Sequence, residues 1–454
     1  MIDATKMLSE FAADLKFENL PQEAVDTTKM FIADYYAACA AGYKVNKRFN
    51  EAMLGILNGM GGNPEAGILF SDKKLPVENA AFMNAVYAHG ADMDDGNRKA
   101  MGHVAAHVMS AVFALAETLD VTWQDVYVAI NVGYEVYNRV AAAVQPGLVH
   151  RGFHSTGTAG AVACGAACAK LMGMNAEQIY NAMAIAAIQA SGLIIIAESG
   201  QSCKPLNPAN AAKTGIISAK LTAGGVAGPI HPLESKKGWF HAMSDEIDES
   251  MITDGLGEKF TICESYLKPY PSCRHTHCGI EGAMLIRERI IRKYGGFCSE
   301  KVQKIQVFIY KNAIQIAGQI KIPATPDDAK FSIHYSLATA LLKGRYTLAD
   351  LELENITDEI KQIVDKIELV EELTMENTKT GIRGSKTVVT LEDGEQFCET
   401  VSIPKGDAAN PFTWEDMKDK FDSCFDGVSE SKCSFNHIKN LELTEQFISI
   451  SNIL

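Results

Sequence analysis

The chain has 454 residues, with 42 Lys and Arg against 56 Asp and Glu, which gives a formal net charge of −14. At about 150 residues per domain, this length suits two or three domains. Hydrophobic residues make up 47% and charged residues 22%, a composition that excludes a wholly disordered chain. The negative charge argues against nucleic acids and membrane surfaces as partners, because both are polyanionic. A small anionic substrate stays compatible, since it responds to the local field of its pocket.

The chain shows no sign of secretion or membrane insertion. Met1 to Phe11 carries acidic groups where a signal peptide would have basic ones. The most apolar stretch, 182–197, is shorter than the ~20 residues that cross a bilayer. The eleven cysteines are an odd number and form no Cys-x-x-Cys, which is typical of reduced thiols. We therefore expect a cytoplasmic protein.

Residues 1 to about 260 read as successive helices. Apolar residues recur at helical spacing in 8–17 and 24–41, and the small residues of 158–171 predict a buried, closely packed helix. Further helices are expected at 79–89 and 104–119, and an apolar one at 182–197. Strand signals are nearly absent in this half of the chain.

The pattern changes near Tyr266. Residues 304–310 are β-rich, and 387–391 with 396–401 predict a hairpin around Asp393-Gly394. Helices are expected between them at 279–293 and 327–342, and again from Thr413 onward. We predict a mostly α fold, with a large helical domain formed by both chain ends (1–265 and 403–454) and an inserted, smaller α+β domain (266–402).

Four segments carry residues suited to acid–base chemistry. Asp92-Met-Asp-Asp95, followed by His103, joins two apolar helices, and Asp92 and Asp95 share a side if a helical turn continues there. The spacing excludes an EF-hand, and a solvated loop is the alternative. Gly152-Phe-His154 opens the small-residue helix, where free backbone N–H groups attract an anion; tight packing with a capping histidine is the alternative.

The other two segments supply cations. Lys204 follows the apolar stretch in a Pro- and Asn-rich segment, and the alternative is a solvated lysine. Residues 266–278 hold Lys268, Arg274 and His277 beside two cysteines, but metal ligands this close together cannot converge tetrahedrally on one zinc ion. We favour a cationic cluster between the domains over a metal site.

Together, His103, His154, Lys204 and Lys268 predict a pocket for a di- or tricarboxylate. Histidine moves protons near neutral pH, and lysines hold carboxylates.

These segments resemble, in order, those of the MmgE/PrpD family, which includes 2-methylcitrate dehydratase, cis-aconitate decarboxylase and iminodisuccinate epimerase. The resemblance rests on these segments: Asn84 to Asp95, Met101-Gly-His103, Gly152 to Gly157, Leu171 to Asn175, Ile188 to Gly192, Lys204-Pro-Leu, Gly215-Ile, Gly228-Pro229, Lys268 to Cys273, and His277. It implies a helical domain with an inserted α+β lid, a homodimer, and a site between the domains that needs neither a metal nor an organic cofactor. Carried over by position, that site comprises Asp92, His103, His154, Lys204, Lys268, His277 and Tyr335.

The chain also departs from the family pattern. Val104 replaces the usual proline after the first active-site histidine, and Gly96 stands where the decarboxylases have threonine. Ala209 stands where many members have glycine. These changes leave the proton-transfer residues in place and weigh against cis-aconitate decarboxylation.

The leading hypothesis is a cofactor-independent lyase that dehydrates a citrate-like hydroxy-polycarboxylate. We expect His103 and His154 to be the acid and base, in an order that the sequence leaves open, with Asp92 orienting one of them and Tyr335 as a donor. Lys204 and Lys268 would hold carboxylates, with Arg274, His277 and Asp95 also binding substrate. The alternatives are an epimerase or decarboxylase of a related acid, and a non-catalytic carboxylate-binding protein. The chain lacks the Cys-x-x-Cys spacing that an aconitase-type iron–sulfur cluster would need, which argues against that mechanism.

Overall fold

The computed structural model describes residues 2–197, 202–377, 380–428 and 435–448. As predicted, the fold is mostly helical. The first half contains the helices α1 (Ala4–Asp14), α2 (Gln22–Val45), α3 (Lys47–Gly59), α4 (Val77–Gly90), α5 (Ala105–Ala116), α6 (Trp123–Ala142), α7 (Gly147–His150), α8 (Ser155–Leu171), α9 (Ala176–Ala187), α10 (Leu206–Ala223), α11 (Trp239–Met243) and α12 (Ser250–Thr253). Its only strands among the described residues are the short pair β1 (Ala66–Gly67) and β2 (Lys74–Leu75).

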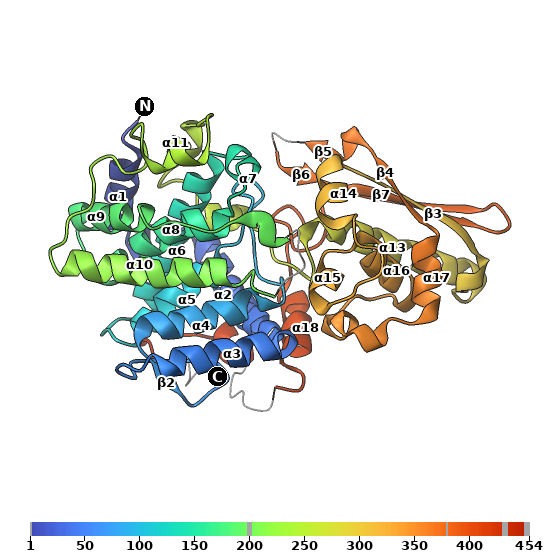
Figure 1. The fold of residues 1–454 in the computed structure, drawn as a ribbon, viewed down its shortest axis with the longest axis horizontal. Coiled ribbons are helices and arrows are strands. Elements are labelled where there is room, and N and C mark those ends of the chain that lie inside the picture. Colours follow the sequence, from blue (N-terminus) through green and yellow to red (C-terminus); the bar gives the residue numbers. More distant parts are fainter. Residues whose placement is uncertain (1, 198–201, 378–379, 429–434, 449–454) are drawn as a thin grey trace.

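Helix α8 lies at the centre of this helical part, with α5, α6, α9 and α10 packed around it (Figure 1). Sixteen of its residues are buried, and nearly all have small side chains. Small side chains let the helix axes approach closely, so the predicted role of 158–171 as a central helix is confirmed. Gly157 shows how close the approach is, because an added Cβ would lie 2.5 Å from the carbonyl oxygen of Ser191.

The second group of elements surrounds one four-stranded sheet. Its strands are ordered β4 (Ile367–Glu371), β3 (Val302–Ile309), β7 (Ser385–Leu391) and β8 (Gln396–Val401), with β3 and β4 parallel and the other pairs antiparallel. The predicted hairpin is thus confirmed. The helices of this part are α13 (Arg274–Tyr294), α14 (Lys311–Ala317), α15 (Pro326–Lys330), α16 (Ile333–Lys343) and α17 (Asp358–Asp365), with the short strands β5 (Glu376–Asn377) and β6 (Ile382–Arg383) beside them.

Two predicted helices differ from the observed elements. The expected helix 327–342 is split into α15 and α16, because Ser332 begins α16 by accepting the backbone N–H of Tyr335 through its Oγ. The expected helix 182–197 ends with α9 at Ala187. Beyond it, Leu193 forms a β-bridge with Phe153, and Gly192 accepts a hydrogen bond from the backbone N–H of His154. The apolar segment therefore serves to position His154.

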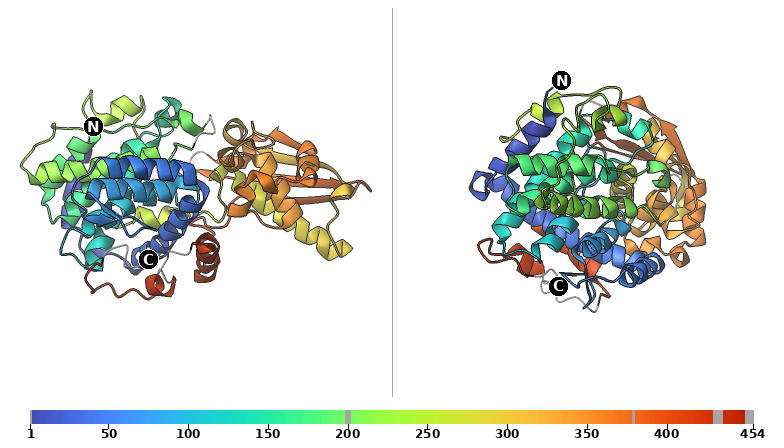
Figure 2. Two further views of the ribbon diagram at one scale, coloured as in Figure 1. Left: turned by 60° about the horizontal axis from the view of Figure 1, so that its bottom comes forward. Right: turned by 60° about the vertical axis from the view of Figure 1, so that its left-hand side comes forward.

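The chain returns to the helical part after the sheet. Helix α18 (Trp414–Phe425) packs against α2, and α19 (Phe435–Lys439) follows it. In Figures 1 and 2, α18 lies beside the blue N-terminal helices, although it belongs to the red end of the sequence. This placement agrees with a helical part built from both chain ends. The domain boundaries themselves stay a prediction.

Helix α18 is anchored by a buried ion pair. Lys420 Nζ donates to the Asp34 carboxylate on α2 and to the carbonyl oxygen of Met93. Burial raises the pKa of Asp34 to about 6, although Lys420 opposes this rise. No helix of the described residues is both long and apolar enough to cross a membrane.

We expect Lys420→Met to lower the free energy of unfolding by about 3–5 kcal/mol, because it leaves the Asp34 carboxylate buried without its cation. The double variant Asp34→Asn/Lys420→Met should recover most of this loss, since it removes both charges. Urea denaturation of the three proteins at pH 7 measures the effect. Equal stability of Lys420→Met and the wild type would contradict this role.

Candidate functional site

A cavity of about 680 Å³ lies between the helical part and the sheet-containing part. The helical part contributes Asp92, Arg98, His103, His154 and Lys204 to its lining. The segment after Tyr266 contributes Lys268, Arg274, His275, Arg383 and Asp407, among others. Six of the predicted site residues thus meet at one cavity: Asp92, His103, His154, Lys204, Lys268 and Arg274.

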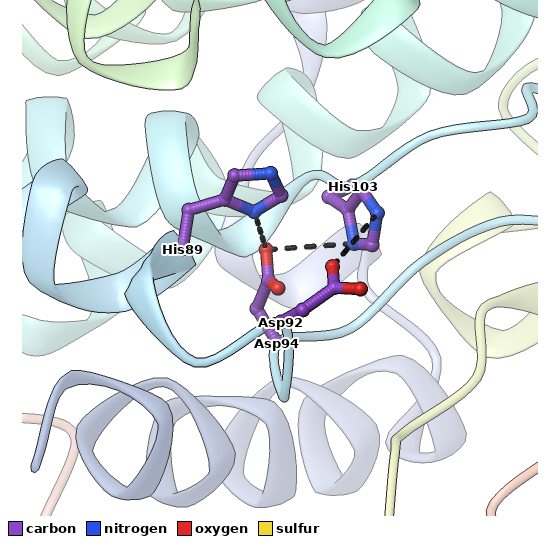
Figure 3. Close-up of side chains that lie close together, drawn as sticks. All are labelled: His89, Asp92, Asp94 and His103. Carbon is purple, nitrogen blue, oxygen red and sulfur yellow. Dashed lines mark hydrogen bonds and ion pairs between the residues drawn. The ribbon is translucent and has the colours of Figure 1, made fainter. Parts of the chain in front are cut away.

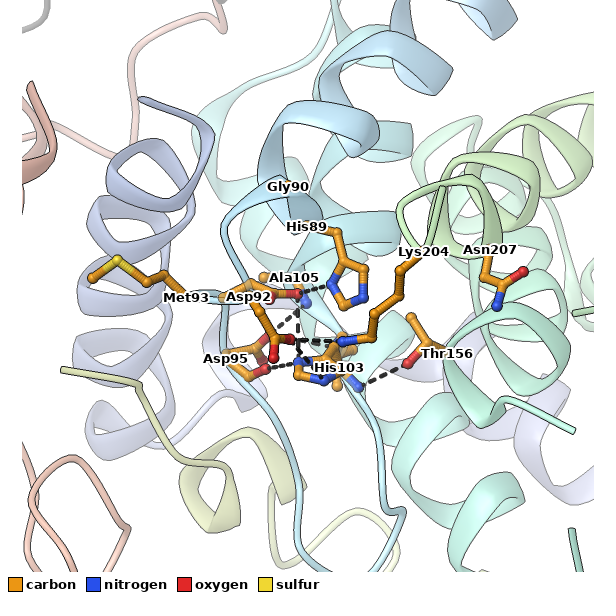
Figure 4. Close-up of polar contacts among 12 residues, drawn as sticks. His89, Gly90, Asp92, Met93, Asp95, His103, Ala105, Thr156, Lys204 and Asn207 are labelled. Carbon is orange, nitrogen blue, oxygen red and sulfur yellow. Dashed lines mark hydrogen bonds and ion pairs between the residues drawn. The ribbon is translucent and has the colours of Figure 1, made fainter. Parts of the chain in front are cut away.

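Asp92 is the buried centre of this group. Lys204 Nζ donates to Asp92 Oδ1 at 2.7 Å (Figure 4). Lys268 Nζ lies 3.1 Å from the same oxygen and 2.9 Å from the Asp92 carbonyl oxygen. Burial acts to raise the pKa of Asp92, but the two ammonium groups outweigh it and hold this pKa well below its usual range. Asp92 is therefore an ionised carboxylate shared by two lysines.

The Asp92 backbone is strained, with φ at +54°. This region is uncommon for a residue with a side chain and is concentrated at functional sites. Helix α4 ends at Gly90, so the helical turn expected between Asp92 and Asp95 does not form. As a result, the two carboxylates point in different directions.

Asp95 is not among the residues that line the cavity, and its expected role in substrate binding stays a prediction. Its Oδ1 accepts the backbone N–H groups of Val104 and Ala105 at the start of α5, and its Oδ2 accepts the Tyr134 hydroxyl at 2.7 Å. Burial and the neighbouring Asp94 raise the pKa of Asp95 to about 7. Asp95 therefore caps the N-terminus of α5, the helix that follows His103.

His89 and Asp94 form a hydrogen-bonded pair that packs against His103. His89 Nδ1 and Asp94 Oδ2 are 2.7 Å apart, and the His89 ring lies 4.7 Å from the His103 ring, centroid to centroid (Figure 3). His103 Nδ1 lies 2.7 Å from the carbonyl oxygen of Asp95 and 3.5 Å from Asp94 Oδ2. Neither residue was predicted from the sequence to belong to the site: His89 lies in the last turn of α4, and Asp94 lies in the acidic segment that follows this helix.

His154 begins α8 and faces the same cavity. Its Nδ1 lies 2.9 Å from the amide nitrogen of Asn207. Burial lowers the pKa of both His103 and His154 well below the usual value, and Lys204 lowers them further. Both rings are therefore neutral at pH 7, the state in which an imidazole nitrogen can accept a proton.

Arg274, His277 and Tyr335 have different positions. Arg274 lines the cavity, with its guanidinium 4.4 Å from the Tyr266 ring centroid and 3.5 Å from the Asp407 carboxylate. His277 is fully buried behind it, 3.3 Å from Arg274 Nη1, and is absent from the lining. Tyr335 is buried in the sheet-containing part, where its hydroxyl donates to the Asp350 carbonyl at 2.6 Å. The structure therefore brings neither His277 nor Tyr335 to the cavity wall.

The loop of residues 90–93 is held by three lysines from distant parts of the chain. Their ammonium groups donate to its backbone carbonyls: Lys330 to Gly90 at 2.8 Å, Lys268 to Asp92 at 2.9 Å, and Lys420 to Met93 at 2.7 Å. Each lysine also pairs with a carboxylate, on Asp327, Asp92 and Asp34 respectively. The position of the Asp92 side chain thus depends on both the sheet-containing part and α18.

Four side chains of the site, those of His89, Asp92, Asp94 and His103, are close enough together to hold a metal ion. However, the Asp92 carboxylate is already neutralised by two ammonium groups within 3.1 Å. A divalent cation there would be repelled by both lysines. The donor set thus suits hydrogen-bonded protons and ammonium groups better than a metal.

Two family models match most of the chain. The MmgE/PrpD N-terminal domain matches residues 6–250, and the MmgE/PrpD C-terminal domain matches residues 270–442. A cis-aconitate decarboxylase-like protein of Aspergillus oryzae is 24% identical over 100% of this chain and 96% of its own. Human cis-aconitate decarboxylase is 26% identical over 77% of this chain and 73% of its own. A 2-methylcitrate dehydratase of Salmonella typhimurium is 24% identical over 53% of this chain and 51% of its own.

The capping role of Asp95 predicts a pH-dependent effect of its removal. A carboxyl whose folded-state pKa is raised from 3.8 to about 7 contributes stability below pH 3.8 that is lost as the pH rises through 7. Asp95→Asn keeps the acceptor for α5 but cannot ionise, so its stability relative to the wild type should increase between pH 5 and pH 8. Urea denaturation at both pH values measures this difference, and a constant difference would contradict the assignment.

Asp95→Ala is the complementary variant. It leaves two backbone N–H groups and the buried Tyr134 hydroxyl without their acceptor, and should cost about 2 kcal/mol.

Proposed function

Because this chain belongs to the MmgE/PrpD family, we propose that it is a lyase that dehydrates a citrate-like hydroxy-polycarboxylate by acid–base catalysis. The observation that carries the proposal is the charge of the cavity. Five cationic side chains (Arg98, Lys204, Lys268, Arg274 and Arg383) line it against two carboxylates (Asp92 and Asp407). The lining thus has three excess positive charges in a protein of net charge −14. This excess matches the charge of a tricarboxylate.

The chemistry follows from the same groups. Removal of a proton next to a carboxylate places negative charge on that carboxylate, and fixed cations lower the barrier by several kcal/mol. Lys204 and Lys268 are held at one point by Asp92, which orients them before substrate arrives. The neutral rings of His103 and His154 supply nitrogens that can accept a proton or donate a hydrogen bond. No step in this scheme requires an organic cofactor.

A second candidate is decarboxylation of a polycarboxylate such as cis-aconitate. It is favoured by the decarboxylase relatives, which match a larger share of this chain than the dehydratase does. Gly96 argues against it, because a Cβ at this position would lie 2.4 Å from the Tyr266 hydroxyl. The threonine expected in the decarboxylases therefore has no room unless Tyr266 moves. For this reason dehydration remains our first proposal.

We also propose that residues 266–402 act as a lid and that the protein works as a cytoplasmic homodimer. The lining of the cavity by both parts of the chain supports the lid. Exposed apolar side chains support the dimer: Ile188, Leu193, Ile195, Leu221, Val226 and Ile230. Small-angle scattering with and without citrate tests closure, and light scattering tests the dimer; a monomer at micromolar concentration would contradict it.

The decisive experiment is incubation with citrate, 2-methylcitrate, isocitrate, cis-aconitate and iminodisuccinate in D₂O, followed by proton NMR. Loss of water from a hydroxy acid supports dehydration, and loss of carbon dioxide supports decarboxylation. Deuterium exchange without loss of either indicates an epimerase. If none of the five compounds changes, the proposed function is wrong.

Lys204→Met should lower kcat/KM by about 10²–10³-fold, because it removes one fixed cation from the developing charge. Lys204 also lowers the pKa of His103 and His154. Its removal should raise both pKa values and move the acid limb of the pH–rate profile to higher pH. Lys220→Met is the matched control, since Lys220 lies on α10, the helix that follows Lys204, and pairs with Glu78 outside the cavity. An unshifted acid limb in Lys204→Met would contradict this assignment.

A further inference from the structure

The two histidines of the site differ in which ring nitrogen carries the proton. His103 Nδ1 faces only acceptors, namely the Asp95 carbonyl oxygen at 2.7 Å and Asp94 Oδ2 at 3.5 Å. A nitrogen between two acceptors must be the one that is protonated. In the neutral ring of His103, Nε2 therefore has the free lone pair, and it lies 3.9 Å from Asp92 Oδ1 at the cavity.

His154 has the opposite arrangement because of Asn207. The Asn207 amide nitrogen lies 2.9 Å from His154 Nδ1 and 3.2 Å from the Leu193 carbonyl oxygen. A carbonyl oxygen can only accept, so the contact with Leu193 fixes which end of the Asn207 amide is the NH₂ group. This NH₂ group then donates its second hydrogen to His154 Nδ1. The neutral ring of His154 must carry its own proton on Nε2.

The Asn207 amide has little freedom to turn over. It lies at the start of α10, three residues after Lys204 (Figure 4). An added Cβ at Gly192 would be 3.1 Å from Asn207 Oδ1, and one at Gly157 would be 3.3 Å from Asn207 Cβ. Gly192 also accepts the backbone N–H of His154 at 3.0 Å. Gly192 thus lies against both Asn207 and His154 and fixes their positions relative to each other.

We propose that Asn207 is a positioning residue that fixes His154 as the Nε2–H tautomer, which makes His154 a neutral hydrogen-bond donor and His103 the general base. This assignment rests on the proposed lyase function and goes further, because it gives each histidine one role. It follows from the geometry of the two rings.

The dehydration step then balances as follows. His103 Nε2 takes the proton from the carbon next to a carboxylate, and the C–H electron pair forms the new C=C bond. The C–O bond breaks with its electron pair on oxygen, and the proton on His103 passes to that oxygen, which leaves as water. His154 Nε2–H donates a hydrogen bond to the carboxylate oxygen that gains charge, and it keeps its proton throughout. A neutral histidine is well suited to this role, because its remaining N–H is a donor that does not have to titrate.

The tautomers can be measured without substrate. Long-range ¹⁵N–¹H correlation spectra of histidine-labelled wild-type protein distinguish protonated from unprotonated ring nitrogens, with His103→Gln and His154→Gln spectra for assignment. We expect unprotonated Nε2 in His103 and unprotonated Nδ1 in His154. The same tautomer in both rings would overturn the proposal, whether or not the protein turns over any acid of the panel. Absence of turnover with the expected tautomers would instead refute the proposed function alone.

The role of Asn207 is tested by Asn207→Asp. A carboxylate at this position accepts from Nδ1, so it should invert the His154 tautomer in the same spectra. We expect kcat to fall on the order of 10²–10³-fold, the usual loss for one donor at a developing charge, with a much smaller change in KM. Asn210→Asp is the matched control, because Asn210 is exposed on the same helix and receives the same charge change. An unchanged tautomer or an unchanged kcat in folded Asn207→Asp would overturn the positioning role.

Discussion

The arrangement of the site depends on a carboxylate that is buried in the protein and still ionised. Burial of Asp92 alone would favour its neutral form, and the ammonium groups of Lys204 and Lys268 reverse that preference. The backbone of the 90–93 loop is held by the same kind of group, because the ammonium groups of Lys268, Lys330 and Lys420 donate to its carbonyl oxygens. An isolated loop could not hold a φ of +54° at Asp92 against its strain. Hydrogen bonds therefore tie the 90–93 loop to both the sheet-containing part and α18.

The same charges set the protonation states of the other groups. The lysines that attract a carboxylate also disfavour imidazolium, and burial acts in the same direction. The positive charge of the lysines would thus both attract a polyanion and keep the two histidines neutral. Asp94 lies behind His103 and contacts two histidines, since its Oδ2 is within 3.5 Å of Nδ1 of both His89 and His103. In the proposed reaction, the protonated His103 ring would have the Asp94 carboxylate beside it.

Much of the fold could be predicted because it follows local periodicity. The small residues of α8, the hairpin of β7 and β8, and the capping box at Thr413 are all readable from short windows. The convergence of Asp92, His103, His154, Lys204 and Lys268 needed an assumption about tertiary structure, which the family resemblance supplied.

The positions of Asp95 and Tyr335 outside the cavity lining could not be predicted, because backbone geometry and long-range partners decide them. A left-handed residue at Asp92 turns Asp95 toward α5, and no propensity signals such a residue. Tyr335 lies on a helix whose orientation the sequence does not give. Asn207 could have been noticed as a polar residue three positions after Lys204, but its proposed role requires the position of Leu193.

The contact of Lys420 with the 90–93 loop has a consequence for synthesis of the protein. Lys420 follows Met93 by 327 residues in the chain, yet it supplies one of the three donors that hold the loop. At about 5–20 residues per second, the ribosome adds Lys420 roughly 16–65 s after the loop itself. During this interval the helical part can be in place, but Asp34 has no cation and the loop lacks its third donor. The 90–93 loop therefore lacks one of its three lysine donors until Lys420 has been synthesised.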